Sequence, residues 1–138
     1  MIKIAVIGVG SMGQNHARIF FHSDSAELVA VSDNNTESVE RIAKRYNAKS
    51  YTNYQEMLNN EQIDAVAIAV PTSLHKEVTI AALNHKKHVL LEKPIASNEQ
   101  EAQEIIACAQ KNNVKLMIGH IERFNTAIIE LKNRLERG

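Results

Sequence analysis

A glycine-rich turn that follows directly on a short apolar segment constrains the fold of this chain more than any other feature. Residues 2–7 are apolar apart from one lysine, and they lead into Gly8-Val9-Gly10-Ser11-Met12-Gly13. The spacing G-x-G-x-x-G is typical of a strand that turns sharply into a helix. Gly8 allows the tight turn, Gly10 leaves the backbone open to an approaching anion, and Gly13 lets the helix pack closely on the strand. The helix N-terminus then offers free N–H groups and a partial positive charge to a phosphate.

Apolar runs and segments with helical spacing alternate along the rest of the chain. The apolar runs predict strands at 2–7, 28–31, 65–70, 89–91 and 114–118, with a weaker candidate at 48–52. Most of these runs are near-continuous, as expected for strands that are covered on both faces. Helical spacing predicts helices at 12–21, 37–46, 55–59 and 74–83, and a further helix through 102–109, which Ser97 and Gln100 would start as a capping box. This order predicts an α/β fold with a doubly wound parallel sheet (Rossmann), about six strands and helices on both faces.

Composition narrows the class of protein. With 138 residues, 44% of them hydrophobic and 23% charged, the chain is expected to form one globular domain. Lys plus Arg equals Asp plus Glu at 16 each, which removes the general electrostatic case for binding nucleic acid or a membrane surface. A single cysteine cannot form an internal disulfide, no apolar run is long enough for a membrane span, and no leader peptide is visible. We therefore expect a cytoplasmic domain.

An acidic residue stands at the end of the second predicted strand. Asp33 lies twenty residues after Gly13, where an acid in dinucleotide-binding folds accepts hydrogen bonds from ribose hydroxyls. Asn34 and Asn35 follow it, and no arginine is present there to receive a 2′-phosphate, so NAD is favoured over NADP. The alternative interpretation is a glycine turn with a helix-capping aspartate and no cofactor.

Polar segments follow three further predicted strands, at 71–75, 92–94 and 119–125. Because parallel strands end at one edge of a sheet, these segments would lie beside the glycine loop and form an active site. Lys93 is the strongest single candidate, since it projects from the sheet edge and Pro94 restricts its backbone. A lysine that is desolvated beside a bound ligand can exchange a proton near neutral pH. The alternative is a solvated lysine before a turn.

The histidines carry less specific signals. His75 either contacts a ligand or only braces the fourth predicted helix, and His120 either contacts a ligand or hydrogen-bonds a strand end. The remaining histidines are expected at the surface or in packing; they are His16, His22, His85 and His88. No pair of histidines has metal-ligand spacing with Cys108, so we predict no metal site. No nucleophile elbow of a serine hydrolase is present.

Taken together, these motifs resemble the Gfo/Idh/MocA family of NAD(P)-dependent sugar and cyclitol oxidoreductases, over residues 2–128. The motifs that carry the resemblance are the glycine loop and the segments Val70–His75, Lys87–Ala96 and Gly119–Asn125. The last of these is most similar to members that act on UDP-linked N-acetylated sugars, such as UDP-N-acetylglucosamine 3-dehydrogenases. Thr126, where that subgroup tends to have proline, and Asn84-His85, where a glycine turn is usual, depart from the pattern.

The resemblance implies a role for each motif. Asp33 would hold the adenosine ribose, and Glu92 would lie near the nicotinamide. Lys93 would be the catalytic residue, binding the reacting hydroxyl and assisting proton removal as hydride leaves, and it would share the substrate with His120 and Arg123. The pyrophosphate would rest on the glycine loop, and further residues would line the cofactor site; the loop residues are Gly8, Gly10, Ser11, Met12 and Gly13, and the lining residues are Pro71, Thr72 and His75.

The resemblance also implies a second domain, which supplies most substrate contacts and the surface for oligomerisation in the family. We therefore expect residues 1–120 to form the NAD(P)-binding domain and residues 121–138 to start the connection to a C-terminal domain that is absent from these 138 residues. The expected activity is hydride transfer between NAD and a sugar or sugar-nucleotide hydroxyl, by a homo-oligomeric parent protein, with this chain inactive alone. The alternatives are a non-catalytic NAD-binding regulatory or sensor module, or another dehydrogenase class on the same fold.

Overall fold

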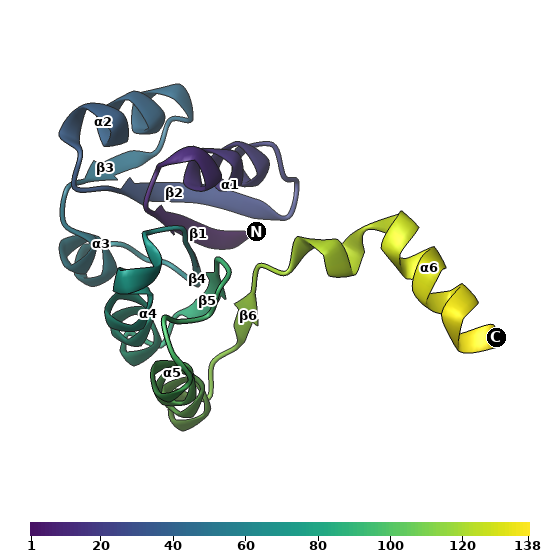
Figure 1. Ribbon diagram of the computed structural model, residues 1–138. Coiled ribbons are helices and arrows are strands. Elements are labelled where there is room, and N and C mark those ends of the chain that lie inside the picture. The colour runs from purple at the N-terminus through teal and green to yellow at the C-terminus, as the bar shows by residue number, and fades with distance from the viewer.

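The computed structural model describes residues 1–138, and a parallel six-stranded sheet organises them (Figure 1). The strand order is β3-β2-β1-β4-β5-β6, and every neighbouring pair is parallel. The order therefore reverses between β1 and β4, which is the topological switch point where ligands bind in such sheets. The predicted Rossmann fold is confirmed. The strands are β1 (Ile2–Ile7), β2 (Ala26–Ser32), β3 (Lys49–Tyr51), β4 (Ala65–Ile68), β5 (His88–Leu91) and β6 (Leu116–Ile118).

Helices cover both faces of the sheet. Figure 1 shows α1 (Ser11–Phe21) and α2 (Thr36–Arg45) on one side, and α3 (Tyr54–Asn60), α4 (His75–Asn84) and α5 (Glu99–Asn112) on the other. Successive strand residues point to opposite faces, so the core is divided into two clusters. In β1, Val6 packs with α1 and α2, whereas Ala5 and Ile7 pack with α3, α4 and α5. Burial on both faces explains why the central strands β1 and β4 are nearly continuously apolar rather than alternating.

Several element boundaries differ from the sequence prediction. Strand β4 ends at Ile68, and Ala69 and Val70 after it lie against Gly8, whose built Cβ would be 2.7 Å from the Ala69 carbonyl oxygen. A short 3₁₀ turn, η1 (Thr72–Leu74), precedes α4, which therefore begins at His75. Strand β6 begins at Leu116 instead of Val114.

The predicted capping box is wrong by one residue. Asn98, not Ser97, is the N-cap of α5, and its side-chain oxygen accepts a hydrogen bond from the Glu101 N–H at 3.0 Å. The Glu101 carboxylate in turn accepts a weaker bond from the Ser97 N–H at 3.3 Å. Asparagine and serine are comparably favourable N-caps, so the sequence cannot tell which of two adjacent residues caps the helix; the packing of the helix decides it.

Two helical elements near the C-terminus were not predicted from the sequence. They are the 3₁₀ turn η2 (Ile121–Phe124) and α6 (Thr126–Arg137), which Asn125 caps through the Ala127 N–H at 3.0 Å. Figure 1 shows α6 extending away from the sheet and its covering helices. Its apolar side chains are exposed accordingly; they include Ile128, Ile129, Leu131 and Leu135. None of the helices in the structure combines the length and the hydropathy that crossing a bilayer requires.

Candidate functional site

Close backbone packing explains two of the three glycines in the loop between β1 and α1. Gly8 adopts φ +86°, a left-handed conformation that side chains rarely tolerate, and it lies against Ala69. A Cβ built on Gly13 would lie only 1.8 Å from the Gly8 carbonyl oxygen. Glycine at these two positions therefore lets the chain leave β1, turn tightly and bring α1 down onto the strand.

Gly10 has a different environment, because a Cβ built there meets no atom within 4 Å. Gly10 is exposed and occupies the N-cap position of α1, where no side chain accepts from the helix N–H groups. Ser11 and Met12, which follow in the first turn, are also exposed. An open backbone above an uncapped helix N-terminus fits a phosphate group, which would accept the free N–H donors.

The Asp33 carboxylate braces the loop beside it. Its Oδ2 accepts a hydrogen bond from the Val9 N–H at 2.7 Å, and its Oδ1 accepts from the Asn35 N–H at 2.9 Å. Asn35 in turn caps α2 through the Ser38 N–H at 2.8 Å. Each carboxylate oxygen has a further lone pair, so both remain able to accept hydrogen bonds from a ribose. The residues of this half of the edge thus fit the adenosine and pyrophosphate of a dinucleotide.

His75 is buried and holds two loops together. Its Nδ1 lies 2.8 Å from the Pro94 carbonyl oxygen and its Nε2 lies 3.0 Å from the Val70 carbonyl oxygen. Only 1% of the His75 surface is exposed, so the ring contacts these two loops and is not itself open to solvent at the sheet edge. Of the residues that precede it, Pro71 is exposed and Thr72 is half-buried in η1. The structure therefore places Pro71 and Thr72 at the edge and His75 beneath it.

Glu92 and Lys93 follow β5 with opposite environments. Glu92 is buried, and its Oε1 lies 2.8 Å from the Nε2 of His16 on α1. Gly119, at the end of β6, packs on the same carboxylate, since a Cβ there would lie 3.3 Å from Glu92 Oε1. Lys93 is exposed, and the Lys93–Pro94 peptide bond is cis. The Lys93 side chain is therefore free to meet a ligand at the strand ends.

His120 and Arg123 lie where the chain leaves the sheet. Both are exposed, and their backbones belong to the turn around η2, in which the Arg123 N–H donates to the His120 carbonyl oxygen at 3.1 Å. Neither side chain makes a hydrogen bond or ion pair within the structure. The glycine loop, Asp33, the 71–72 segment and Lys93 thus share one sheet edge, with His120 and Arg123 on the segment that departs from it.

Sequence reasoning missed His16 as a residue of this edge. We expected it at the surface or in packing; its side chain is 13% exposed, which agrees with packing, and the bond to Glu92 was not predicted. A signal was present in the helical spacing, because Gly13, Ala17 and Phe20 turn toward the sheet on the same side of α1. His16, three residues after Gly13, lies on that side as well.

The titratable groups with shifted pKa values are not among the site residues described above. Hydrogen bonding to Glu61, together with burial, raises the pKa of the Tyr51 phenol at the end of β3 to about 12. The Lys49 ammonium, 2.8 Å away, and the Tyr51 hydroxyl lower the pKa of Glu61. This cluster ties β3 to the end of α3. Its polar groups are paired with one another and not presented to a ligand.

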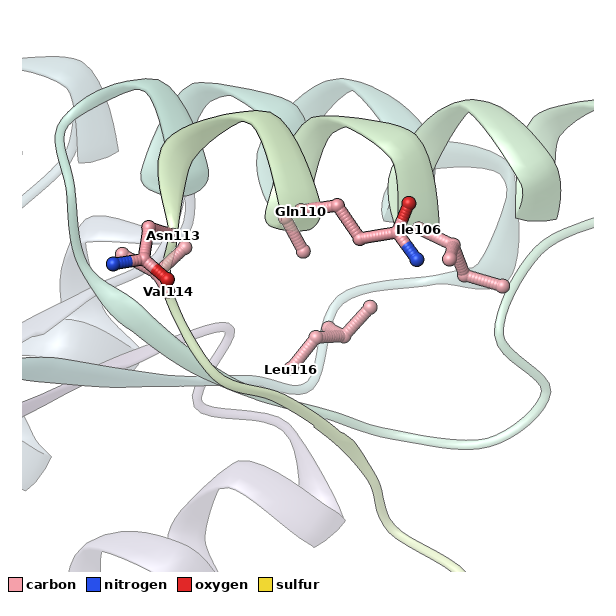
Figure 2. Close-up of a pocket in the computed structure, with 6 residues that line it drawn as sticks. Ile106, Gln110, Asn113, Val114 and Leu116 are labelled. Atoms are coloured by element: carbon pink, nitrogen blue, oxygen red, sulfur yellow. The ribbon is translucent and has the colours of Figure 1, made fainter.

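A pocket of about 390 Å³ lies outside the strand-end site. It sits between α5 and the edge strand β6, where Figure 2 shows Leu116 beneath Ile106 and Gln110. None of the predicted site residues lines it. No group of three or more His, Cys, Asp or Glu side chains is arranged to hold a metal ion.

Comparison with known proteins gives several relatives, most of them named as dehydrogenases or oxidoreductases. An uncharacterized oxidoreductase of Streptococcus pneumoniae is 35% identical over the whole chain, and this chain covers 37% of it. The inositol 2-dehydrogenase of Salmonella typhimurium is 31% identical over 99% of the chain and 42% of the relative. The UDP-N-acetylglucosamine 3-dehydrogenase of Acidithiobacillus ferrooxidans is 34% identical over 95% of the chain and 41% of the relative. The chain thus spans less than half the length of these curated relatives.

Solved structures agree with the fold. The scyllo-inositol dehydrogenase of Lactobacillus casei, with bound NAD(H) and scyllo-inositol, superposes with a TM-score of 0.94 at 26% identity, over 100% of this chain and 42% of that one. The WlbA dehydrogenase of Bordetella pertussis, in complex with NADH and UDP-GlcNAcA, superposes with a TM-score of 0.94 at 27% identity, over 99% and 42%. The family model for oxidoreductases with an NAD-binding Rossmann fold matches residues 2–120. The chain therefore belongs to the Gfo/Idh/MocA oxidoreductase family and is an NAD-binding Rossmann domain of it.

Proposed function

We propose that this chain is the cofactor-binding part of a dehydrogenase that transfers hydride between NAD and a hydroxyl group of a sugar or sugar nucleotide. One observation carries the proposal: an exposed lysine, Lys93, stands at the same sheet edge as an open glycine loop and a ribose-accepting aspartate. Convergence of a nucleotide site and a candidate base at the switch-point edge is the arrangement that hydride transfer needs.

Each group at the edge has a part in this proposal. The free N–H groups of the first turn of α1 would hold the pyrophosphate, and Asp33 would hold the adenosine ribose. When bound, NAD supplies the acceptor for the hydride. Lys93 Nζ would hydrogen-bond the reacting hydroxyl and accept its proton, so that the alcohol loses a hydride from carbon and a proton from oxygen. Arg123 and His120 would contact the substrate from the segment that follows β6.

The favoured substrate is a UDP-linked N-acetylated sugar. Support comes from the 119–125 segment and from the relative that is a UDP-N-acetylglucosamine 3-dehydrogenase. Inositols are the second candidate, because inositol dehydrogenases are relatives of similar identity.

A substrate panel tests the proposal. We expect the longest protein that the gene encodes to reduce NAD with UDP-N-acetylglucosamine, followed by NADH absorbance, and the 138-residue chain alone to show little or no turnover. Turnover with inositols and none with the sugar nucleotide would identify inositols as the substrate class instead. Binding of NAD with no turnover on either class would favour a non-catalytic NAD-binding regulatory or sensor module, and full activity of the 138-residue chain would contradict the expected need for a second domain.

NAD is expected to stabilise the 138-residue chain more than NADP does. At a hundredfold excess over its dissociation constant, a ligand adds about 2.7 kcal/mol, which for a domain of this size raises the melting temperature by roughly 10 °C. The Asp33 carboxylate would repel a 2′-phosphate, so NADP should give a clearly smaller shift. Differential scanning fluorimetry measures both shifts. Asp33→Asn keeps one acceptor for the Val9 N–H and should bring the two shifts closer, whereas equal shifts in the wild type would contradict the role given to Asp33.

A further inference from the structure

A largely buried hydrogen-bonded pair connects the glycine-loop helix to the loop after β5. His16 Nε2 and Glu92 Oε1 lie 2.8 Å apart, with 13% and 10% of their side chains exposed. The two residues are 76 positions apart in the sequence and come from α1 and from the end of β5. A carboxylate only accepts hydrogen bonds, so the histidine nitrogen is the donor. The pair therefore orients a negative charge at the strand-end site.

Two further contacts hold the Glu92 carboxylate in place. Its Oε2 accepts a hydrogen bond from the Lys93 N–H at 3.3 Å, and Gly119 leaves only enough room for the carboxylate beside the end of β6. Three segments, which are α1, the turn after β5 and the end of β6, thus fix one carboxylate group. The ring of Phe20 stacks on the His16 ring, with the two centroids 6.0 Å apart.

The topology assigns this carboxylate to the nicotinamide half of the site. The glycine loop after β1 and Asp33 after β2 account for the pyrophosphate and adenosine. A dinucleotide lies across the switch point, so its other half extends over the ends of β4 and β5. Glu92 directly follows β5, and its charge is largely shielded from water.

We propose that the His16–Glu92 pair favours binding of oxidised over reduced nicotinamide, with His16 acting as the positioning residue for the Glu92 charge. The oxidised ring carries a positive charge and the reduced ring carries none, so a nearby carboxylate stabilises only the oxidised form. The Glu92 carboxylate is largely removed from water, so solvent weakens its attraction for a positive charge only slightly. The Lys93 ammonium carries the opposite charge, but it is exposed and therefore screened by solvent and salt. The inference rests on the cofactor placement in the proposed function.

The ratio of the dissociation constants for NAD⁺ and NADH tests the inference on the 138-residue chain itself. We would measure both constants by calorimetry in one buffer at one fixed pH. Glu92→Gln should shift the ratio toward NADH by about tenfold, which corresponds to about 30 mV for a two-electron couple. His16→Asn should shift it in the same direction by about threefold, because the carboxylate loses its anchor. Glu27→Gln removes the same charge from the exposed amino end of β2 and should leave the ratio unchanged.

The outcomes separate this inference from the cofactor assignment. Tight binding of both nucleotides with an unchanged ratio in Glu92→Gln would overturn the inference and leave the cofactor assignment intact. Should that variant fail to fold, an unchanged ratio in His16→Asn would overturn it equally. Failure of the wild type to bind either nucleotide would overturn the cofactor assignment and, with it, the inference. A lower melting temperature in His16→Asn with no change in the ratio would mark the pair as structural only and would also overturn it.

Discussion

Gly13→Ala is expected to destabilise the domain by about 4 kcal/mol or more, at the upper end of single-substitution effects. The added Cβ would lie 1.8 Å from the Gly8 carbonyl oxygen, a backbone atom that no rotamer change can move away. Relief requires α1 to separate from β1, which would disrupt the packing of Ala17 against Val6 and Val9. Because a domain of this kind has a total stability of only about 5–15 kcal/mol, we expect a large loss of melting temperature or failure to fold. Urea unfolding followed by circular dichroism measures the change.

Gly10→Ala is the matched control, since the same methyl group enters the same loop. It meets no atom within 4 Å, and φ −65° is ordinary for alanine, so the cost should stay near 1 kcal/mol, the usual loss for alanine at an N-cap. The methyl group would instead occupy the space above the helix N-terminus, and we expect NAD binding to weaken at least tenfold, by calorimetry. A Gly13→Ala protein as stable as the wild type would disprove the packing argument. Unchanged NAD binding in Gly10→Ala would place the pyrophosphate elsewhere.

Lys93→Ala is expected to lower kcat by about a hundredfold to ten-thousandfold in the longest protein that the gene encodes, which is the range for loss of a general base. The dissociation constant for NAD should change less than about twofold, and so should the stability, because Lys93 is exposed and its Nζ bonds no other group. Steady-state kinetics with UDP-N-acetylglucosamine measures the effect. Lys93→Arg keeps the positive charge but cannot serve as a base, so it should lose turnover as well.

The exposed Lys115 provides a control at the opposite end of the sheet. It lies at the amino end of β6, whereas the candidate site lies at the carboxyl ends of the strands, so Lys115→Ala should leave kcat unchanged. Full activity of Lys93→Arg would assign an electrostatic role instead of proton transfer. Unchanged hydride transfer in Lys93→Ala would remove the lysine from the mechanism.

The glycine loop and the strands could be predicted from the sequence because both depend on interactions between residues close together in the chain. The left-handed φ of Gly8 and the contact of Gly13 with the Gly8 carbonyl oxygen both arise within a six-residue loop, and near-continuous apolar runs mark strands with two buried faces. Six strands with alternating helices then leave few topologies, since crossovers are right-handed. The position of Asp33 followed from its spacing to the loop.

Contacts between side chains from different strands and helices could not be predicted in the same way. The bond from the Val9 N–H to Asp33 and the contact between His16 and Glu92 join residues 24 and 76 positions apart. The contacts of both His75 ring nitrogens with the Val70 and Pro94 carbonyl oxygens were likewise not predicted. No pattern in a single sequence reports such pairs.

The sequence by itself determined the fold, the glycine loop, the acid after β2 and the strand ends at which polar groups gather. These features are periodic or local, and the physical rules that produce them act over a few residues. Only the tertiary structure decided which of the gathered groups are buried and which are free. It placed Glu92 under Gly119 and beside His16 and left Lys93 exposed, although the two residues are adjacent in the chain. Burial of this kind depends on how α1, β5 and β6 pack together, and this packing is set by the whole molecule.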